Sequence, residues 1–278
     1  MRVSVVQMNA GADKAENIAQ ARRLIEAAVE SDRPHILSLP EVWSCMGGDR
    51  DGKFRQAEDL PPPGSNLEGG AAYEFLRATA REKQIHVHGG SIGERAGERL
   101  FNTTVVFNPT GTEIARYRKI HLFDITTPDG MTFGESRTYT SGADIVTYEA
   151  NGVKVGCAIC YDVRFPELFV RLRQAGAELI FLPAAFTLQT GKDHWETLIR
   201  ARAIETQCWI AAPAMYGAHK EGNGEVRSTY GHSLIADPWG HVVTKASDGV
   251  GWATARIDPS LTSRIRRDMP VMEQRKLG

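Results

Sequence analysis

Residues 155–166, VGCAICYDVRFP, join an apolar run to a segment that carries a thiol, an aspartate and an arginine. The small and apolar residues up to Ile159 are typical of a buried strand, and Pro166 suits the first turn of a helix. The pattern therefore predicts a strand, a sharp turn at Cys160 and a helix. A sharp turn between a strand and a helix can expose a nucleophile. The first N–H groups of the helix also favour a nearby negative charge such as a thiolate.

The segments on either side alternate between strand-like and helix-like patterns. Upstream, Asn151-Gly152 separates two apolar runs and favours the type I′ turn of a hairpin. Downstream, apolar residues at helical spacing predict one helix from Pro166 to Gly176 and another over residues 193–206. Further strands are expected over 2–8, 35–39, 85–92, 101–108, 113–119, 144–150, 153–159, 178–185, 207–215, 231–244 and 251–257, and helices over 13–30, 68–83 and 258–270.

The order of these segments mixes helix-linked buried strands with hairpin-linked amphipathic strands. It predicts an α/β fold in which helices pack outside sheets. Two stretches interrupt the pattern, DLPPPGSN at 59–66 and GAHKEGNGEVRS at 217–228, and both are short enough to be loops. We therefore expect one domain over residues 1–278.

Composition limits the partners that the chain can have. Its 33 basic and 34 acidic residues leave a formal charge of -1, which favours a small neutral or weakly charged ligand over nucleic acid or an anionic membrane. The N-terminal apolar run is too short for a secretory signal, and no stretch approaches a membrane span. Four cysteines, at 45, 157, 160 and 208, are too few and too scattered for a disulfide framework. These features predict a cytoplasmic protein with free thiols.

Cys160 is the candidate nucleophile, with a buried unreactive thiol as the alternative. In a continuous strand Cys157 and Cys160 point to opposite faces, which disfavours a Cys-x-x-Cys metal or redox site. A thiol with an ordinary pKa of about 8.5 is mostly protonated near neutral pH and needs a base. Glu41 and Lys119 each follow a predicted strand, and functional groups of α/β folds gather at the carboxyl ends of strands. Taken alone, each could equally be a solvated surface charge.

Histidines offer two alternative sites. His121 could activate the thiol as in a Cys-His hydrolase. His86 and His88 share one strand face, but the sequence supplies no clear third ligand, so we expect a structural role and no metal. Residues 194–196 are expected to open a helix and to support the pocket.

Three segments together resemble the Glu-Lys-Cys sites of the nitrilase superfamily of carbon-nitrogen hydrolases: SLPEVW at 38–43, YRKIHLFD at 117–124 and CAICYDVRFPE at 157–167. The resemblance implies a four-layer α-β-β-α sandwich, assembly into a homodimer or larger homo-oligomer, and no cofactor. It extends over nearly the whole chain, through TFGESRTYTSG (132–142), AGAELIFLPAAF (175–186), HWETLIRARAIETQCW (194–209) and YGHSLIADPWG (230–240).

The resemblance also implies a role for each matching residue. Cys160 is expected to be the nucleophile, Glu41 the general base and later acid, and Lys119 the cation that stabilises the oxyanion. The backbone N–H of Tyr161 is expected to be the second oxyanion donor, and Glu135 to be a second glutamate beside these groups. The substrate amide is then hydrolysed through a thioester to an acid and ammonia, without a metal.

Within the superfamily, the segments are most similar to the small Nit-type amidases, which act on deaminated glutathione or on ω-amides such as α-ketoglutaramate. RARAIETQ at 200–207 and YGHS at 230–233 favour deaminated glutathione. Arg164 is expected to hold a substrate carboxylate, and Phe186 and Thr190 to lie near the substrate. A nitrilase, an aliphatic amidase or a carbamoyl-amide hydrolase stays open, as does a non-catalytic binding module on the same fold.

Overall fold

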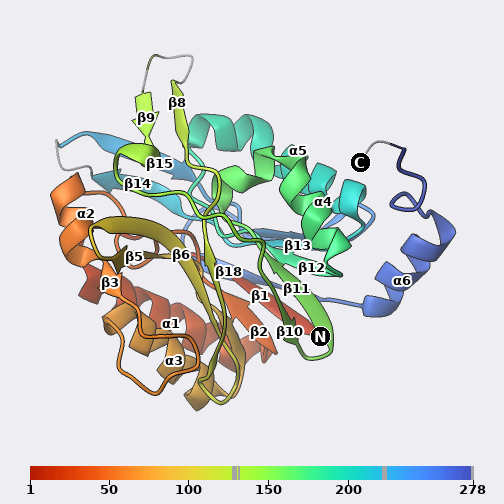
Figure 1. Cartoon of the computed structure of the whole chain (residues 1–278), viewed down its shortest axis with the longest axis horizontal. Coiled ribbons are helices and arrows are strands. Elements are labelled where there is room, and N and C mark those ends of the chain that lie inside the picture. The colour runs from red at the N-terminus through yellow and green to blue at the C-terminus, as the bar shows by residue number, and fades with distance from the viewer. Residues whose placement is uncertain (127–129, 131, 221–223, 277–278) are drawn as a thin grey trace.

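The computed structural model describes residues 1–126, 130, 132–220 and 224–276. Two sheets face each other at its centre (Figure 1). The first sheet consists, in order, of β18 (Gly251–Arg256), β1 (Arg2–Gln7), β2 (Ile36–Ser38), β4 (His86–His88), β6 (Arg99–Phe107), β5 (Ile92–Ala96) and β3 (Glu58–Asp59), with β7 (Glu113–Arg118) paired to β6. The second consists of β10 (Thr147–Ala150), β11 (Val153–Cys157), β12 (Leu179–Phe181), β13 (Trp209–Ala212), β16 (Leu234–Ala236) and β17 (Val242–Lys245).

Helices cover the outer face of each sheet, which completes the expected α-β-β-α sandwich (Figure 1). α1 (Lys14–Asp32) and α3 (Ala71–Lys83) lie on the first sheet, and α4 (Pro166–Gln174) and α5 (Leu188–Thr206) on the second. Alternation along β1 explains the layering, because Val5 joins the apolar cluster between the sheets while Val6 joins the cluster under α1 and α3. Each such fully buried side chain contributes about 1.5–3 kcal/mol.

The hairpin between β10 and β11 has the predicted turn. Asn151 and Gly152 both have positive φ angles, 50° and 75°, as a type I′ turn requires. The hairpin fixes the register of β11, in which Gly156 faces α4 and a Cβ there would lie 3.2 Å from the side chain of Leu172. Cys157, the next residue, belongs to the opposite face and lies in the core between the sheets.

Three segments differ from the sequence predictions. Residues 217–228 are not simply a loop, because β14 (Tyr216–Lys220) and β15 (Val226–Tyr230) form a hairpin; residues 221–223 lie outside the described residues. α5 begins at Leu188 rather than at 193, since the Thr187 side chain caps it by accepting the N–H of Thr190. Residues 194–196 therefore lie inside this helix instead of opening it.

Several shorter elements had no clear sequence signal. They are α2 (Arg50–Gln56), the hairpin of β8 (Asp124–Thr126) and β9 (Thr132–Gly134), and the 3₁₀ turn η1 (Glu135–Arg137). The 3₁₀ turn η2 (Cys160–Arg164) lies where the sharp turn was predicted. The C-terminal helix α6 (Pro259–Asp268) was expected. The shorter elements lie beside the pocket or contribute residues to it, whereas α6 does not.

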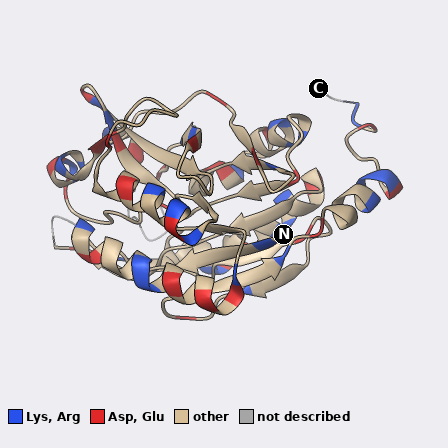
Figure 2. Cartoon of the chain, turned by 90° about the horizontal axis from the view of Figure 1, so that it is seen from below, with Lys and Arg blue, Asp and Glu red and all other residues tan. Residues whose placement is uncertain are grey.

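The charges on the fold carry no marked excess of one sign. Figure 2 shows basic and acidic residues interspersed along the helices of the face seen there. Within the described part of the chain, none of the helices has the length and apolar character needed to cross a membrane.

Candidate active site

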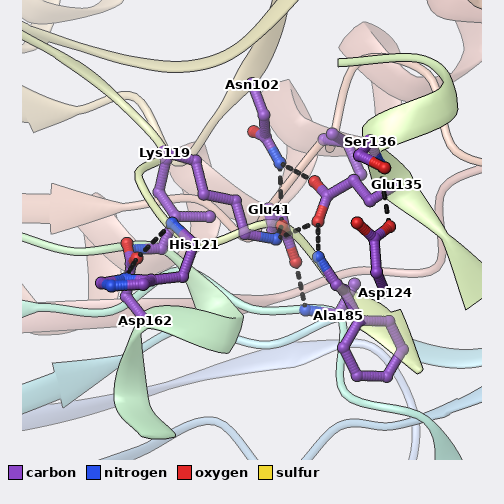
Figure 3. Close-up of polar contacts among 12 residues, drawn as sticks. Glu41, Asn102, Lys119, His121, Asp124, Glu135, Ser136, Asp162 and Ala185 are labelled. Carbon is purple, nitrogen blue, oxygen red and sulfur yellow. Dashed lines mark hydrogen bonds and ion pairs between the residues drawn. The ribbon is translucent and has the colours of Figure 1, made fainter. Parts of the chain in front are cut away.

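Glu41 lies in the turn after β2, and only 4% of its surface is exposed. Its Oε1 accepts hydrogen bonds from Nζ of Lys119 at 2.8 Å and from Nδ2 of Asn102 at 2.9 Å (Figure 3). Its Oε2 accepts the backbone N–H of Ala185 at 2.9 Å. Donors from β6, from the end of β7 and from the segment after β12 thus fix both oxygens of a buried carboxylate.

Lys119 connects Glu41 to a second carboxylate. Its Nζ also donates to Oε2 of Glu135 at 2.8 Å, and that oxygen accepts the N–H of Phe123 at 2.7 Å. Burial alone lowers the pKa of Lys119, but the charges of Glu135 and Glu41 outweigh it and leave this pKa well above its usual value. The lysine therefore stays charged and suits the stabilisation of negative charge rather than the removal of a proton.

Cys160 is the first residue of η2, and its φ of 47° is an uncommon conformation for a residue with a side chain. Its N–H donates to the carbonyl of Pro183 at 2.8 Å, which ties the turn to the end of β12. The predicted sharp turn is present, but α4 begins only at Pro166, after η2. The N-terminus of α4 therefore does not lie directly behind the sulfur, contrary to the prediction from the sequence.

The surroundings of the thiol favour its protonated form. Burial is the main cause that raises the pKa of Cys160 well above its usual value, and the charge of Glu41 raises it further. The charge of Lys119 and the N–H of Ala185 act in the opposite direction. A neutral thiol beside a buried carboxylate needs that carboxylate as a base before it can attack.

Asp162 supports the turn that carries Cys160. This fully buried carboxylate accepts the N–H of Ile159 at 2.8 Å and the hydroxyl of Tyr117 at 2.7 Å through Oδ2. Its Oδ1 accepts the N–H of His121 at 3.1 Å and lies 2.7 Å from Nδ1 of the same residue. Since Tyr117 belongs to β7, Asp162 connects the turn at Cys160 to the strand that precedes Lys119.

His121 does not occupy the position of a base. Its ring stacks on Phe165 with centroids 3.7 Å apart, and it is absent from the pocket lining. Figure 3 shows the pair of His121 and Asp162 to one side of the cluster around Glu41. The arrangement therefore favours Glu41 over a Cys-His pair.

A pocket lined by described residues opens onto the cluster, and its lining contains all the residues expected from the sequence except one. Tyr161, Phe186 and Thr190 line it together with the reactive side chains. Phe186 also packs on Trp195 of α5, with centroids 4.9 Å apart. The described hydrogen bonds assign no acceptor to the backbone N–H of Tyr161, which follows Cys160 directly.

Arg164 is the exception. Its guanidinium carbon lies 5.4 Å from the ring centre of Phe186 and 5.9 Å from that of Tyr161, and Nη2 lies 3.2 Å from Nδ1 of His194. These two rings line the pocket, whereas Arg164 does not. Binding of a substrate carboxylate by Arg164 remains a prediction.

Several residues of the site had no signal in the sequence. Asn102 lies in the middle of β6, and its Nδ2 donates to Oε1 of Glu135 at 3.2 Å as well as to Glu41. Phe123, Phe133 and Arg227 also line the pocket. An asparagine inside an apolar strand, or an arginine after a glycine-rich stretch, has no local signature, and only the approach of distant segments gives these residues a role.

The other thiols and histidines fit structural roles. All four cysteines are free, and burial raises the pKa of Cys157, which lies between the sheets. His88 stacks on Phe181 with centroids 4.6 Å apart, and burial lowers its pKa to about 3. Across the described residues, no group of three or more His, Cys, Asp and Glu side chains could hold a metal ion.

Known proteins resemble this chain over its full length. It is 38% identical over 277 residues to a deaminated glutathione amidase of Synechocystis, which covers 98% of this chain and 97% of that one. It is 36% identical over 278 residues to human omega-amidase NIT2, covering 99% and 95%. The crystal structure of Nit3 from Saccharomyces cerevisiae, a member of branch 10 of the nitrilase superfamily, matches with a TM-score of 0.87 at 30% identity, covering 100% and 97%. The model of the carbon-nitrogen hydrolase family matches residues 2–267, and the chain belongs to that family.

Proposed function

We propose that this carbon-nitrogen hydrolase uses Cys160 as its nucleophile, Glu41 as its proton carrier and Lys119 as its electrostatic catalyst. The observation that carries the proposal is the buried contact of Glu41 with Lys119 in the pocket that also contains the protonated thiol. In the first step Glu41 takes the thiol proton and the sulfur attacks the amide carbonyl carbon. The developing oxyanion is stabilised by Nζ of Lys119 and by the N–H of Tyr161.

The second half of the reaction uses the same groups. Glu41 returns its proton to the leaving nitrogen, the C–N bond breaks, and a thioester to Cys160 remains. Water then enters, Glu41 removes one of its protons, and collapse of the second tetrahedral intermediate releases the acid and the thiol. Glu135 positions Lys119 through the bond from Nζ, and that ion pair helps to keep the lysine charged.

Deaminated glutathione is the substrate that we propose. The support is the name of the Synechocystis relative, together with a pocket whose lining combines aromatic side chains with cations outside the cluster, Lys53 and Arg227. The amide in this substrate is secondary, joining the distal carboxyl carbon of an α-keto diacid to cysteinylglycine. Its hydrolysis therefore releases the dipeptide, whereas the expected ammonia is the product only of a primary amide.

The test is to measure kcat/KM of the purified protein on deaminated glutathione, α-ketoglutaramate, a simple aliphatic amide and a nitrile. Release of cysteinylglycine or of ammonia is followed as each substrate requires. Cys160→Ala should abolish turnover without unfolding the protein, while Cys208→Ala, a buried thiol outside the pocket, should retain it. Activity in Cys160→Ala would refute the nucleophile assignment.

Omega-amidase activity is the second candidate, favoured by the similarity to human omega-amidase NIT2. The same cluster would act, with α-ketoglutaramate as the substrate and ammonia as the leaving group. A higher kcat/KM on α-ketoglutaramate than on deaminated glutathione would select this function.

Two expectations about the whole protein remain predictions. One is assembly into a homodimer or larger homo-oligomer, which light scattering of the purified protein measures. The other is a cytoplasmic location, which fractionation of the source cells measures.

A further inference from the structure

The hairpin of β14 and β15 is held against the loop that follows Glu41. The N–H of Gly48 donates to the carbonyl of Lys220 at 3.3 Å, and a Cβ added at Gly47 would collide with that carbonyl oxygen. His219 of this hairpin is buried. Its Nδ1 lies 2.7 Å from the carbonyl oxygen of Ala10, and its Nε2 lies 2.8 Å from the hydroxyl of Thr229. These contacts fix β15 so that residues 227–229 line the pocket.

An aromatic wall connects Arg227 to the nucleophile. The guanidinium carbon of Arg227 lies 4.5 Å from the ring centre of Phe133. The Phe133 ring lies 5.1 Å from that of Phe123, which in turn lies 5.0 Å from that of Tyr161, the residue after Cys160. Every member of this wall lines the pocket, so a bound substrate can extend along it from the sulfur toward the arginine.

The pocket lining differs in charge between the region around the Cys160 sulfur and the region away from it. Around the sulfur, Glu41 and Glu135 share the single cation Lys119. Away from this cluster the lining contains Lys53 and Arg227. A carboxylate on the substrate is repelled by the paired glutamates and attracted by these two cations, and the planar guanidinium offers it a two-pronged contact.

The direction of proton transfer places the leaving group on this side. Glu41 must reach the departing nitrogen, so the amine part of the substrate lies toward Glu41 and the loop of residues 42–48 that follows it. That loop is the one that the hairpin contacts. A leaving dipeptide spans about 7 Å when extended, which carries its terminal carboxylate away from the cluster toward the hairpin.

We propose that Arg227 is a specificity residue that binds a carboxylate at the far end of the substrate's leaving group. The site would then select peptide-like amides, such as deaminated glutathione, over primary ω-amides, whose leaving group is ammonia. This inference rests on the proposed function and extends it to the amine side of the substrate.

The experiment compares two substrates that differ only at the proposed contact: deaminated glutathione and the same compound with its glycine carboxylate converted to a carboxamide. For the wild type, kcat/KM should be about 10- to 100-fold lower on the carboxamide, the range expected when a hydrogen bond between charged groups is lost. Arg227→Met should lower kcat/KM on deaminated glutathione by a similar factor. On the carboxamide it should change kcat/KM less than threefold, because the contact is already absent.

Three variants test whether the substrate-dependent loss of kcat/KM is due to the guanidinium of Arg227 or to another group. Arg227→Lys keeps the charge without the planar fork and should give an intermediate loss. Arg164→Met, which removes a cation outside the lining, should affect the two substrates equally. If Lys53→Met rather than Arg227→Met shows the substrate-dependent loss, the assignment to Arg227 is wrong. Thermal unfolding of each variant checks that the hairpin change has not unfolded the protein.

The outcomes distinguish this inference from the proposed function. If the wild type hydrolyses both compounds with equal kcat/KM, the substrate is right and the role of Arg227 is wrong. Equal losses on both substrates in Arg227→Met would mean that the arginine only shapes the pocket. If the wild type hydrolyses neither compound, the proposed substrate fails, and this inference fails with it.

Discussion

Nζ of Lys119 and Oε1 of Glu41 lie 2.8 Å apart, with 2% and 6% of their side chains exposed. This pair is part of a closed ring, because Lys119 and Asn102 each donate to both Glu41 and Glu135. Two side-chain donors thus bridge the two carboxylates, and only one of these donors carries a charge. Replacing different residues of the ring should therefore lower the free energy of unfolding by different amounts.

Replacement of Lys119 should lower the free energy of unfolding more than replacement of Glu41. Lys119→Met leaves two buried carboxylates without a cation and should lower the free energy of unfolding by about 3 kcal/mol. Glu41→Gln leaves Lys119 paired with Glu135 and should lower it by only about 1 kcal/mol. Urea unfolding near pH 7 measures both values, and equal losses would contradict the ring. Both variants should also lower kcat by at least about 100-fold.

Asn102 should act as a positioning residue. Asn102→Ala removes one of the two donors that fix Oε1 of Glu41, so kcat should fall about 10- to 100-fold while KM changes little. Asn102→Asp places a third carboxylate in the ring and should be worse than alanine in both activity and stability. Steady-state kinetics on the best substrate provides the measurement. A rise in KM with kcat unchanged would instead indicate that Asn102 only contacts the substrate.

Glu41, Lys119 and Cys160 could be singled out from the sequence because each has a recognisable local context. Glu41 and Lys119 follow strands of clear pattern, and Cys160 lies between an apolar run and a helix-initiating proline. The hairpin turn at Asn151-Gly152 was predictable for the same reason, since its positive φ angles are a property of the dipeptide. Local chemistry was sufficient for the hairpin turn, whereas the roles of Glu41 and Lys119 rest on the resemblance to the nitrilase superfamily, since each alone also fits a solvated surface charge.

The rest depends on contacts between distant segments. The hairpin of β14 and β15 has a sequence typical of a loop, and it is held by the burial of His219 against Ala10, more than 200 residues away. Asn102 gains its role only because β2, β7 and η1 bring acidic and basic groups around it. Arg164 shows the opposite case, because its motif favoured the pocket while its guanidinium lies outside the lining.

Asp162 should hold the nucleophile's turn in its strained conformation. Asp162→Ala leaves the Ile159 N–H and the Tyr117 hydroxyl without acceptors, and the free energy of unfolding should fall by about 2–4 kcal/mol. Activity should fall as well, since Cys160 has a positive φ that this turn maintains. Phe165→Leu, which removes the ring contacts with His121 and Tyr161 but leaves the Asp162 carboxylate in place, should have a smaller effect on both quantities. Equal effects would show that packing rather than the carboxylate holds the turn.

His88 should make the protein sensitive to mild acid. Burial lowers its pKa to about 3 in the folded state, while the unfolded chain has the ordinary value near 6.5. The unfolded state therefore takes up a proton as the pH falls below 6.5 and the folded state does not, so the stability present above pH 6.5 is lost on acidification. Between pH 6.5 and 5 the loss attributable to His88 should be about 2 kcal/mol.

The measurement is the free energy of unfolding in urea at several pH values between 7 and 5, for the wild type and for His88→Phe. Phenylalanine keeps the stacking on Phe181 but cannot be protonated, and it loses the contact with the hydroxyl of Ser38. The variant can therefore be less stable at pH 7, yet its stability should decline less steeply with acid. Equal slopes for the two proteins would mean that His88 does not cause the acid sensitivity, and that His35 and His86, whose pKa values burial also lowers, dominate it.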